Sequence, residues 1–165
     1  MKKFELTENY KMCFGRKLFQ IRALVTINGV VREGETGGYI EKEENLSQFG
    51  NSWVSGNACV YGNARVVGNS LVTENARVSG NAFVAGNSRV TENAYVSENA
   101  LVTGNSRVYG NSHVHGDAFV TENSRVNGNA CVYGNALVYG NAFVTGDFSV
   151  SGDAMVSGDK FVSDN

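Results

Sequence analysis

Apolar and polar positions repeat with a period of six along most of this chain. From Gly50 to Ser163 the sequence consists of 19 consecutive six-residue units, such as GNACVY and GNARVV, without insertion or deletion. The fifth position is Val in every unit, and the third is Ala or Ser except at Phe148 and Lys160. Internal repetition this regular indicates a repeat architecture before any argument from residue propensities.

Each unit predicts one strand and one corner. Residues two apart in a strand point to the same side, so positions three and five are expected to face inward and positions four and six outward. Position one is Gly or Glu, and position two is Asn or Asp. Asn and Asp tolerate the left-handed backbone conformation that a sharp corner needs, and we expect this to be the reason that they recur there. Ser recurs at position three with a spacing of 18, at Ser52, Ser70, Ser88, Ser106 and Ser124. This spacing predicts three units per turn, so that residues 18 apart stack as neighbours.

The register of Asn at the corner, a small residue, a variable residue and Val resembles that of the hexapeptide-repeat proteins. The resemblance implies an all-β fold, a left-handed parallel β-helix of triangular cross-section, here with about six coils. The junction GGYIEKEENLSQFGNSWVSGNACVYGNARV also resembles hexapeptide-repeat proteins commonly encoded by phages and prophages, which are often labelled transferases on repeat similarity alone. Some phage-encoded inhibitors of host CRISPR nucleases are β-helices as well.

The first 49 residues are not repetitive and are expected to cap the solenoid. The stretch KLFQIRALVTINGVVREGETGGYI holds two apolar-alternating runs around Asn28 and Gly29, a typical hairpin turn. We therefore predict two parts, a capping segment with a β-hairpin over residues 1–49 and the β-helix over residues 50–165.

Composition narrows the function classes without selecting one. A formal net charge of -2 gives no general attraction to nucleic acid, so direct nucleic-acid binding is not expected. No run of 18 apolar residues suggests a membrane span, and no apolar stretch follows the first lysines as in a signal peptide. Cys13, Cys59 and Cys131 are too few and too scattered for a disulfide framework or a zinc motif. These features favour a cytoplasmic protein, in the host cell if the chain is phage-encoded.

Stacking at intervals of 18 residues places the outward side chains in three rows. The first row contains a run of arginines that could bind anions, together with an adjacent tyrosine: Arg89, Arg107, Arg125 and Tyr109. The second contains a polar and aromatic group that could also bind a partner: Tyr95, His113, His115 and Tyr133. The third is apolar and is expected to form an interface, by self-association or with a partner, unless the N-terminal segment covers it: Phe83, Leu101, Phe119, Leu137, Met155 and Tyr139.

His113, His115 and Cys131 also permit catalytic interpretations. Hexapeptide acyltransferases use a histidine as general base, which this resemblance would assign to His113 or His115. A metal site of two histidines and one cysteine, or a nucleophilic pair of Cys131 and His113, are further alternatives. The loop that helps form the acyl-donor site in those enzymes has no counterpart in the uninterrupted repeats, and the pair lacks an evident orienting acid.

We therefore expect a non-catalytic β-helical protein that binds macromolecules, with no cofactor and no metal. A homo-oligomer is the expected assembly, and a host defence nuclease is one conceivable partner. A trimeric acyltransferase-like enzyme with a histidine base is the alternative.

Overall fold

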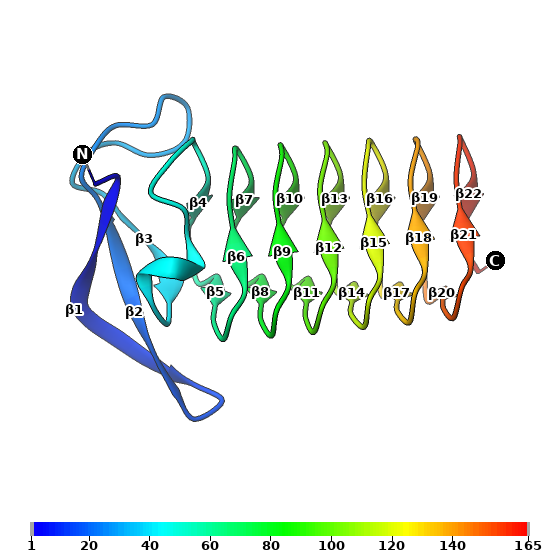
Figure 1. The fold of residues 1–165 in the computed structure, drawn as a ribbon, viewed down its shortest axis with the longest axis horizontal. Coiled ribbons are helices and arrows are strands. Elements are labelled where there is room, and N and C mark those ends of the chain that lie inside the picture. Colours follow the sequence, from blue (N-terminus) through cyan, green and yellow to red (C-terminus); the bar gives the residue numbers. More distant parts are fainter. Residues whose placement is uncertain (1, 165) are drawn as a thin grey trace.

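Nineteen two-residue strands, one for each hexapeptide, form the walls of a rod in the computed structural model, which describes residues 2–164 (Figure 1). Each strand consists of positions four and five of its unit. It pairs in parallel with the strands 18 residues before and after it, as Arg107 does with Arg89 and Arg125. The chain is thus a parallel β-solenoid with three sides, and the six-residue register predicted from the sequence is confirmed.

The strands of the rod belong to three sheets, which we name after their outward residues. The histidine sheet contains β5 (Cys59–Val60), β8 (Arg77–Val78), β11 (Tyr95–Val96), β14 (His113–Val114), β17 (Cys131–Val132) and β20 (Ser149–Val150). The arginine sheet contains β4 (Trp53–Val54), β7 (Leu71–Val72), β10 (Arg89–Val90), β13 (Arg107–Val108), β16 (Arg125–Val126), β19 (Phe143–Val144) and β22 (Phe161–Val162). The apolar sheet contains β6 (Arg65–Val66), β9 (Phe83–Val84), β12 (Leu101–Val102), β15 (Phe119–Val120), β18 (Leu137–Val138) and β21 (Met155–Val156).

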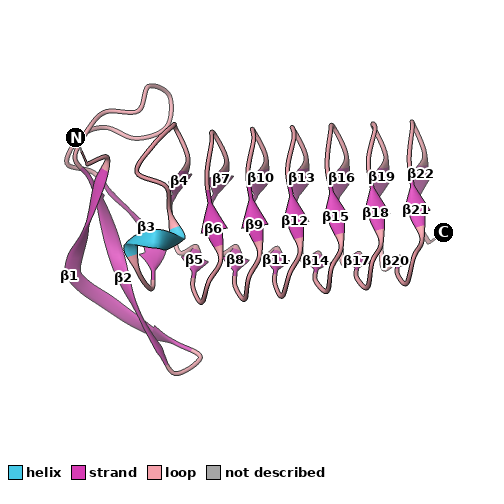
Figure 2. Ribbon diagram, in the orientation of Figure 1, coloured by secondary structure: helices cyan, strands magenta, loops and turns pink. Residues whose placement is uncertain are grey.

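The N-terminal segment extends the histidine sheet at one end of the rod (Figure 2). Strands β1 (Phe4–Cys13) and β2 (Arg16–Ala23) form an antiparallel hairpin, β2 pairs antiparallel with β3 (Thr36–Ile40), and β3 pairs in parallel with β5. A short 3-10 helix, η1 (Glu43–Asn45), follows. The predicted N-terminal hairpin is therefore present.

The tight turn of that hairpin is not where the sequence predicted it. It lies at Phe14 and Gly15, with φ of 50° and 75°, both positive as in the turns that best match strand twist. Asn28 and Gly29 lie instead in the longer loop between β2 and β3, where the bridge between Ile27 and Val31 closes a small turn. Phe-Gly lacks the composition of a typical hairpin turn, which is why the Asn-Gly pair was the stronger sequence signal.

The first turn of the solenoid is built partly from non-repetitive sequence. Tyr39 of β3 stacks on Cys59, and Leu46 pairs with Val66 through an isolated bridge. Together with β4 these segments complete a turn ahead of the remaining hexapeptides, so the rod has about seven turns. No helix among residues 2–164 is long and apolar enough to span a membrane.

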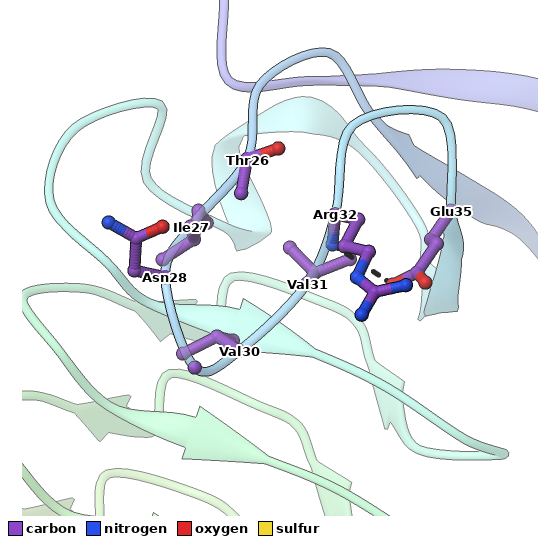
Figure 3. A pocket seen from close by; sticks show the side chains of 8 residues that line it. Thr26, Ile27, Asn28, Val30, Val31, Arg32 and Glu35 are labelled. Atoms are coloured by element: carbon purple, nitrogen blue, oxygen red, sulfur yellow. Dashed lines mark hydrogen bonds between the residues drawn. The ribbon is translucent and has the colours of Figure 1, made fainter.

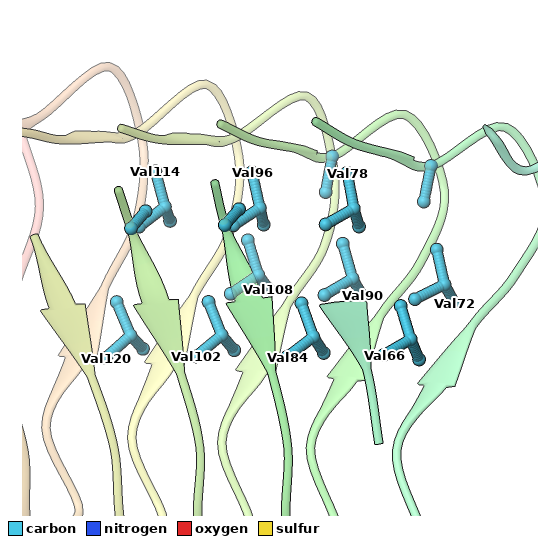
Figure 4. Packing of buried hydrophobic residues seen from close by; sticks show 14 of the residues in the cluster. Val66, Val72, Val78, Val84, Val90, Val96, Val102, Val108, Val114 and Val120 are labelled. Atoms are coloured by element: carbon cyan, nitrogen blue, oxygen red, sulfur yellow. The ribbon is translucent and has the colours of Figure 1, made fainter. Parts of the chain in front are cut away.

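Inward valines fill the interior in three stacks (Figure 4). Val66, Val84, Val102 and Val120 form part of one stack, and each is 0% exposed. The buried serines at position three need a hydrogen-bond partner, and Ser88 finds one because its Oγ donates to the carbonyl oxygen of Ala85 at 2.7 Å. Small residues beside branched ones therefore pack a narrow core.

The corners use position one, not position two, for the left-handed conformation. Position one is Gly or Glu, and its φ is positive, as at Gly104 with φ of 68° and Glu122 with φ of 59°. A Cβ on Gly104 would lie 2.6 Å from the backbone nitrogen of Glu122. Our explanation of the corner asparagines by left-handed tolerance is therefore wrong.

The asparagines at position two instead form hydrogen-bonded ladders along the rod. Asn57 Nδ2 donates to Asn75 Oδ1 at 3.2 Å, Asn75 donates to Asn93, and the pattern repeats at all three corners. The acidic corners Asp147, Asp153 and Asp159 each accept the donor of the preceding rung. An amide serves here because it both donates and accepts, whereas a carboxylate only accepts.

Candidate functional site

The histidine sheet brings together the polar and aromatic residues singled out in the sequence. Tyr95, His113 and Cys131 are consecutive partners across β11, β14 and β17. The Tyr95 ring meets the His113 ring edge-on, with centroids 5.8 Å apart. His113 is exposed and Cys131 is partly exposed, so both side chains are open to solvent.

His115 and Tyr133 form a second contact on the same sheet. Their rings are parallel, with centroids 5.1 Å apart and an interplanar angle of 2°. A Glu98 carboxylate oxygen lies 3.9 Å from His115 Nδ1, while the same carboxylate accepts the backbone N–H of Gly116 at 2.8 Å. This glutamate therefore mainly supports the corner of the solenoid.

The geometry of this sheet offers little catalytic machinery. A shallow depression of about 310 Å³ is lined by Asn75, Arg77, Asn93, Tyr95, Asn111 and His113. None of the residues that line it is an acid that could orient His113 as a base, and Cys131 Sγ donates a weak hydrogen bond to the carbonyl oxygen of Asn129 at 3.9 Å. Among residues 2–164, no three His, Cys, Asp or Glu side chains lie close enough to hold a metal ion. The three-ligand site considered for His113, His115 and Cys131 is therefore absent from the described part of the chain.

Two outward positions near the N-terminus are covered, contrary to the expectation for position four. Trp53 is 1% exposed and Cys59 is 3% exposed. Phe4 of β1 packs edge-on against Trp53 with ring centroids 6.5 Å apart, and Leu18 of β2 packs against Cys59. Burial raises the pKa of the Cys59 thiol, although the nearby Lys11 opposes this effect. The apolar character of the first outward residues was the signal for this cover.

The tip of the hairpin also lies on the histidine sheet, an arrangement that sequence reasoning missed. The Phe14 ring lies 6.2 Å from the Tyr61 ring, and the Arg77 guanidinium lies 5.2 Å from the centroid of Phe14. Within the rod, the Tyr95 hydroxyl contacts Tyr61 OH at 3.3 Å and Ser79 Oγ at 2.9 Å. Burial raises the pKa of Tyr61 well above its usual range, so this phenol stays protonated and is a hydrogen-bonding group only.

The arginine sheet places three guanidinium groups in one column. Arg89, Arg107 and Arg125 are direct partners in adjacent strands and are all exposed. Among the described residues, none of the three forms an ion pair. Tyr109 and Thr91, with two of the arginines, line a depression of about 250 Å³. The predicted anion-binding residues are therefore neighbours in space.

The apolar sheet presents a continuous hydrophobic row. The row consists of direct strand partners and contains Phe83, Leu101, Phe119, Leu137 and Met155. Its first four members are half-buried and Met155 is 58% exposed. The hairpin extends the histidine sheet, so it leaves this row open. A depression of about 300 Å³ lined by Leu46, Phe49, Arg65 and Val67 among others continues it toward the N-terminal end, where Phe49 is 84% exposed.

A further depression lies away from all three rows. It has a volume of about 440 Å³ and belongs to the loop between β2 and β3, where Thr26, Ile27 and Val30 face its interior (Figure 3). The Glu35 carboxylate accepts the backbone N–H of Arg32 at 2.9 Å and so closes the loop. This hydrogen bond stabilises the turn.

Comparison with known proteins agrees with the solenoid. A family model described as the YdcK beta solenoid repeat matches residues 58–74 and 76–92, two segments inside the repeat region. A search of curated proteins found no match. The matched segments span β5 (Cys59–Val60) to β10 (Arg89–Val90). The chain is thus similar to this beta-solenoid repeat over part of its rod.

Proposed function

We propose that this protein is a non-catalytic binding scaffold whose interaction surface is the apolar row on the apolar sheet, and that the row binds a second copy of the chain. The observation that carries the proposal is the unbroken line from Phe83 to Met155, five apolar side chains in direct register with no cover. Large contiguous apolar patches are rare on the surfaces of monomeric proteins, and they commonly mark an interaction site.

The shape of the row suits pairing with itself. Large and smaller residues alternate along it, so two antiparallel copies can interdigitate. A two-fold axis midway between Leu101 and Phe119 would place Leu101 against Phe119 of the other copy and Phe83 against Leu137, so that each large ring faces a smaller side chain in an isologous contact. The backbone of the rod is held by parallel pairing along its whole length, so association would order few groups and lose little entropy.

The test compares two substitutions in the same turn of the rod. Phe119→Glu places a charge in the middle of the row, whereas His113→Glu places the same charge on the histidine sheet. We expect the native chain and His113→Glu to sediment as oligomers at tens of micromolar in analytical ultracentrifugation, and Phe119→Glu to sediment as a monomer. A native chain that stays monomeric across this range, or equal behaviour of both variants, would contradict the proposal.

The more specific hypothesis from the sequence, inhibition of a host nuclease, uses the same scaffold and is open to the same variants. It requires that Phe119→Glu or Arg107→Glu abolish inhibition, whereas the double variant His113→Ala, His115→Ala retains it. The acyltransferase alternative requires the opposite pattern, together with measurable binding of acetyl-coenzyme A by the native chain.

A further inference from the structure

Three stacked arginines without acidic partners are an unusual feature of the arginine sheet. Neighbouring strands lie about 4.8 Å apart, and like charges directly opposite one another destabilise a sheet. Among the described residues, the two glutamates at corners beside the column bind backbone N–H groups and form no ion pair with these arginines. Glu92 accepts the backbone N–H of Gly110 at 2.9 Å, and Glu122 accepts that of Gly140 at 2.8 Å. The column of Arg89, Arg107 and Arg125 is therefore a local cationic patch on a chain whose net charge is -2.

The groups beside the arginines are hydrogen-bond donors as well. The depression of about 250 Å³ is lined by Arg89, Arg107, Thr91 and Tyr109, two guanidinium groups and two hydroxyls with no carboxylate among them. Guanidinium groups present paired N–H donors that match the oxygens of phosphate, and arginine remains charged at all relevant pH values. A tetrahedral anion between two such groups would receive donors from several directions.

We propose that the arginine column is a binding site for a chain of three linked phosphate groups, with the first phosphate held between Arg89 and Arg107 and the third between Arg107 and Arg125. The repeating sheet supplies the spacing, because each turn of the rod presents an equivalent arginine one strand further on. Arg107 lies at the centre and contributes to both positions. This inference goes beyond the proposed function, which rests on a different sheet.

Tripolyphosphate is the probe, and isothermal titration calorimetry in low salt is the measurement. We expect the native protein to bind it, Arg107→Ala to bind at least tenfold more weakly, and Arg107→Lys to fall between them because lysine keeps the charge but loses the paired donors. Arg65→Ala is the matched control. It removes an exposed arginine at position four of the apolar sheet, outside the column, and should bind like the native chain.

Two further measurements distinguish a specific phosphate site from three arginines that only repel one another. Tripolyphosphate should raise the melting temperature of the native chain and of Arg65→Ala but not that of Arg107→Ala. Citrate, a small tricarboxylate, should bind at least tenfold more weakly than tripolyphosphate. The proposal is overturned if the native chain does not bind tripolyphosphate, if Arg65→Ala weakens binding as much as Arg107→Ala does, or if citrate binds equally well. The oligomeric state of Arg107→Ala should equal that of the native chain. Weaker binding by this variant then cannot be due to a change in assembly through the apolar row.

Discussion

The side-chain amide of Asn99 donates a hydrogen bond to the carboxylate of Asp117 at 2.9 Å, and the asparagine ladder at that corner stops there. The amide of Asn135, one turn further on, donates instead to Asp153 at 2.8 Å. Asp117 has no hydrogen to donate to Asn135, so this ladder is divided where the other two are continuous.

Asp117→Asn should therefore join the two parts of the ladder. A new amide at this position can accept from Asn99 and donate to Asn135, and we expect the free energy of unfolding to rise by about 1 kcal/mol. Urea denaturation followed by circular dichroism measures the change. Asp153→Asn, at the last rung of the same ladder, gains no following acceptor and should change stability little. Equal stabilisation by both variants would show that removal of negative charge, rather than the ladder, is responsible.

The free energy of unfolding should depend more on the aromatic ring of Trp53 than on its indole N–H. Its Nε1 is buried without a hydrogen-bond partner, while the ring packs against Phe4. Trp53→Ala should lower the free energy of unfolding by about 3–5 kcal/mol, and Trp53→Phe by less than about 1.5 kcal/mol. Urea denaturation checks both values. A large loss in Trp53→Phe would mean that the N–H has a partner in solution.

Lys3 should make stability depend on pH above neutrality. Its ammonium donates to the backbone oxygen of Ser52 at 2.7 Å, and burial lowers the pKa of Lys3 from 10.5 to about 8. Between these two values the unfolded chain binds a proton that the folded chain has released, so the free energy of unfolding rises with pH. From pH 8 to 9.5 the gain should be about 1.6 kcal/mol, because the folded group is half protonated at pH 8 and the slope approaches about 1.4 kcal/mol per pH unit only above that pH.

Lys3→Met provides the reference for this measurement, because it removes the titrating group. The difference in unfolding free energy between the native chain and Lys3→Met, followed by urea denaturation at several pH values, isolates Lys3 from the tyrosines. A difference that stays constant from pH 8 to 9.5 would contradict the lowered pKa of Lys3.

The cysteines should report whether the hairpin is docked. Cys131 is partly exposed, whereas Cys59 is covered by Leu18 and burial raises its pKa, so an alkylating reagent should modify Cys131 much faster. Leu18→Asp should expose Cys59 and bring its rate near that of Cys131. Leu101→Asp, on the apolar sheet, should leave Cys59 protected. Mass-spectrometric mapping of the modified peptides distinguishes the three thiols, and fast reaction of Cys59 in the native chain would contradict the docking.

Much of the rod could be predicted from the sequence because each unit specifies its own local structure. Val at position five and a small residue at position three indicate the inward side, and the 18-residue spacing of the serines gives three units per turn. The stacking of His113 on Cys131, and of Arg107 between two arginines, follows from that spacing alone. The reason for the corner asparagines was misjudged, because a ladder is a relation between turns and a single unit does not display it.

The sequence by itself determined the strands, the three outward rows and which residues share each row, since these follow from a local period repeated without interruption. Only the tertiary structure decided which outward positions are covered. The hairpin of β1 and β2 has no periodic relation to the rod, so its contacts with Trp53, Cys59 and Tyr61 could not be read from spacing. The apolar row and the arginine column remain exposed because the hairpin packs elsewhere on the rod, and the repeat does not specify where the hairpin packs.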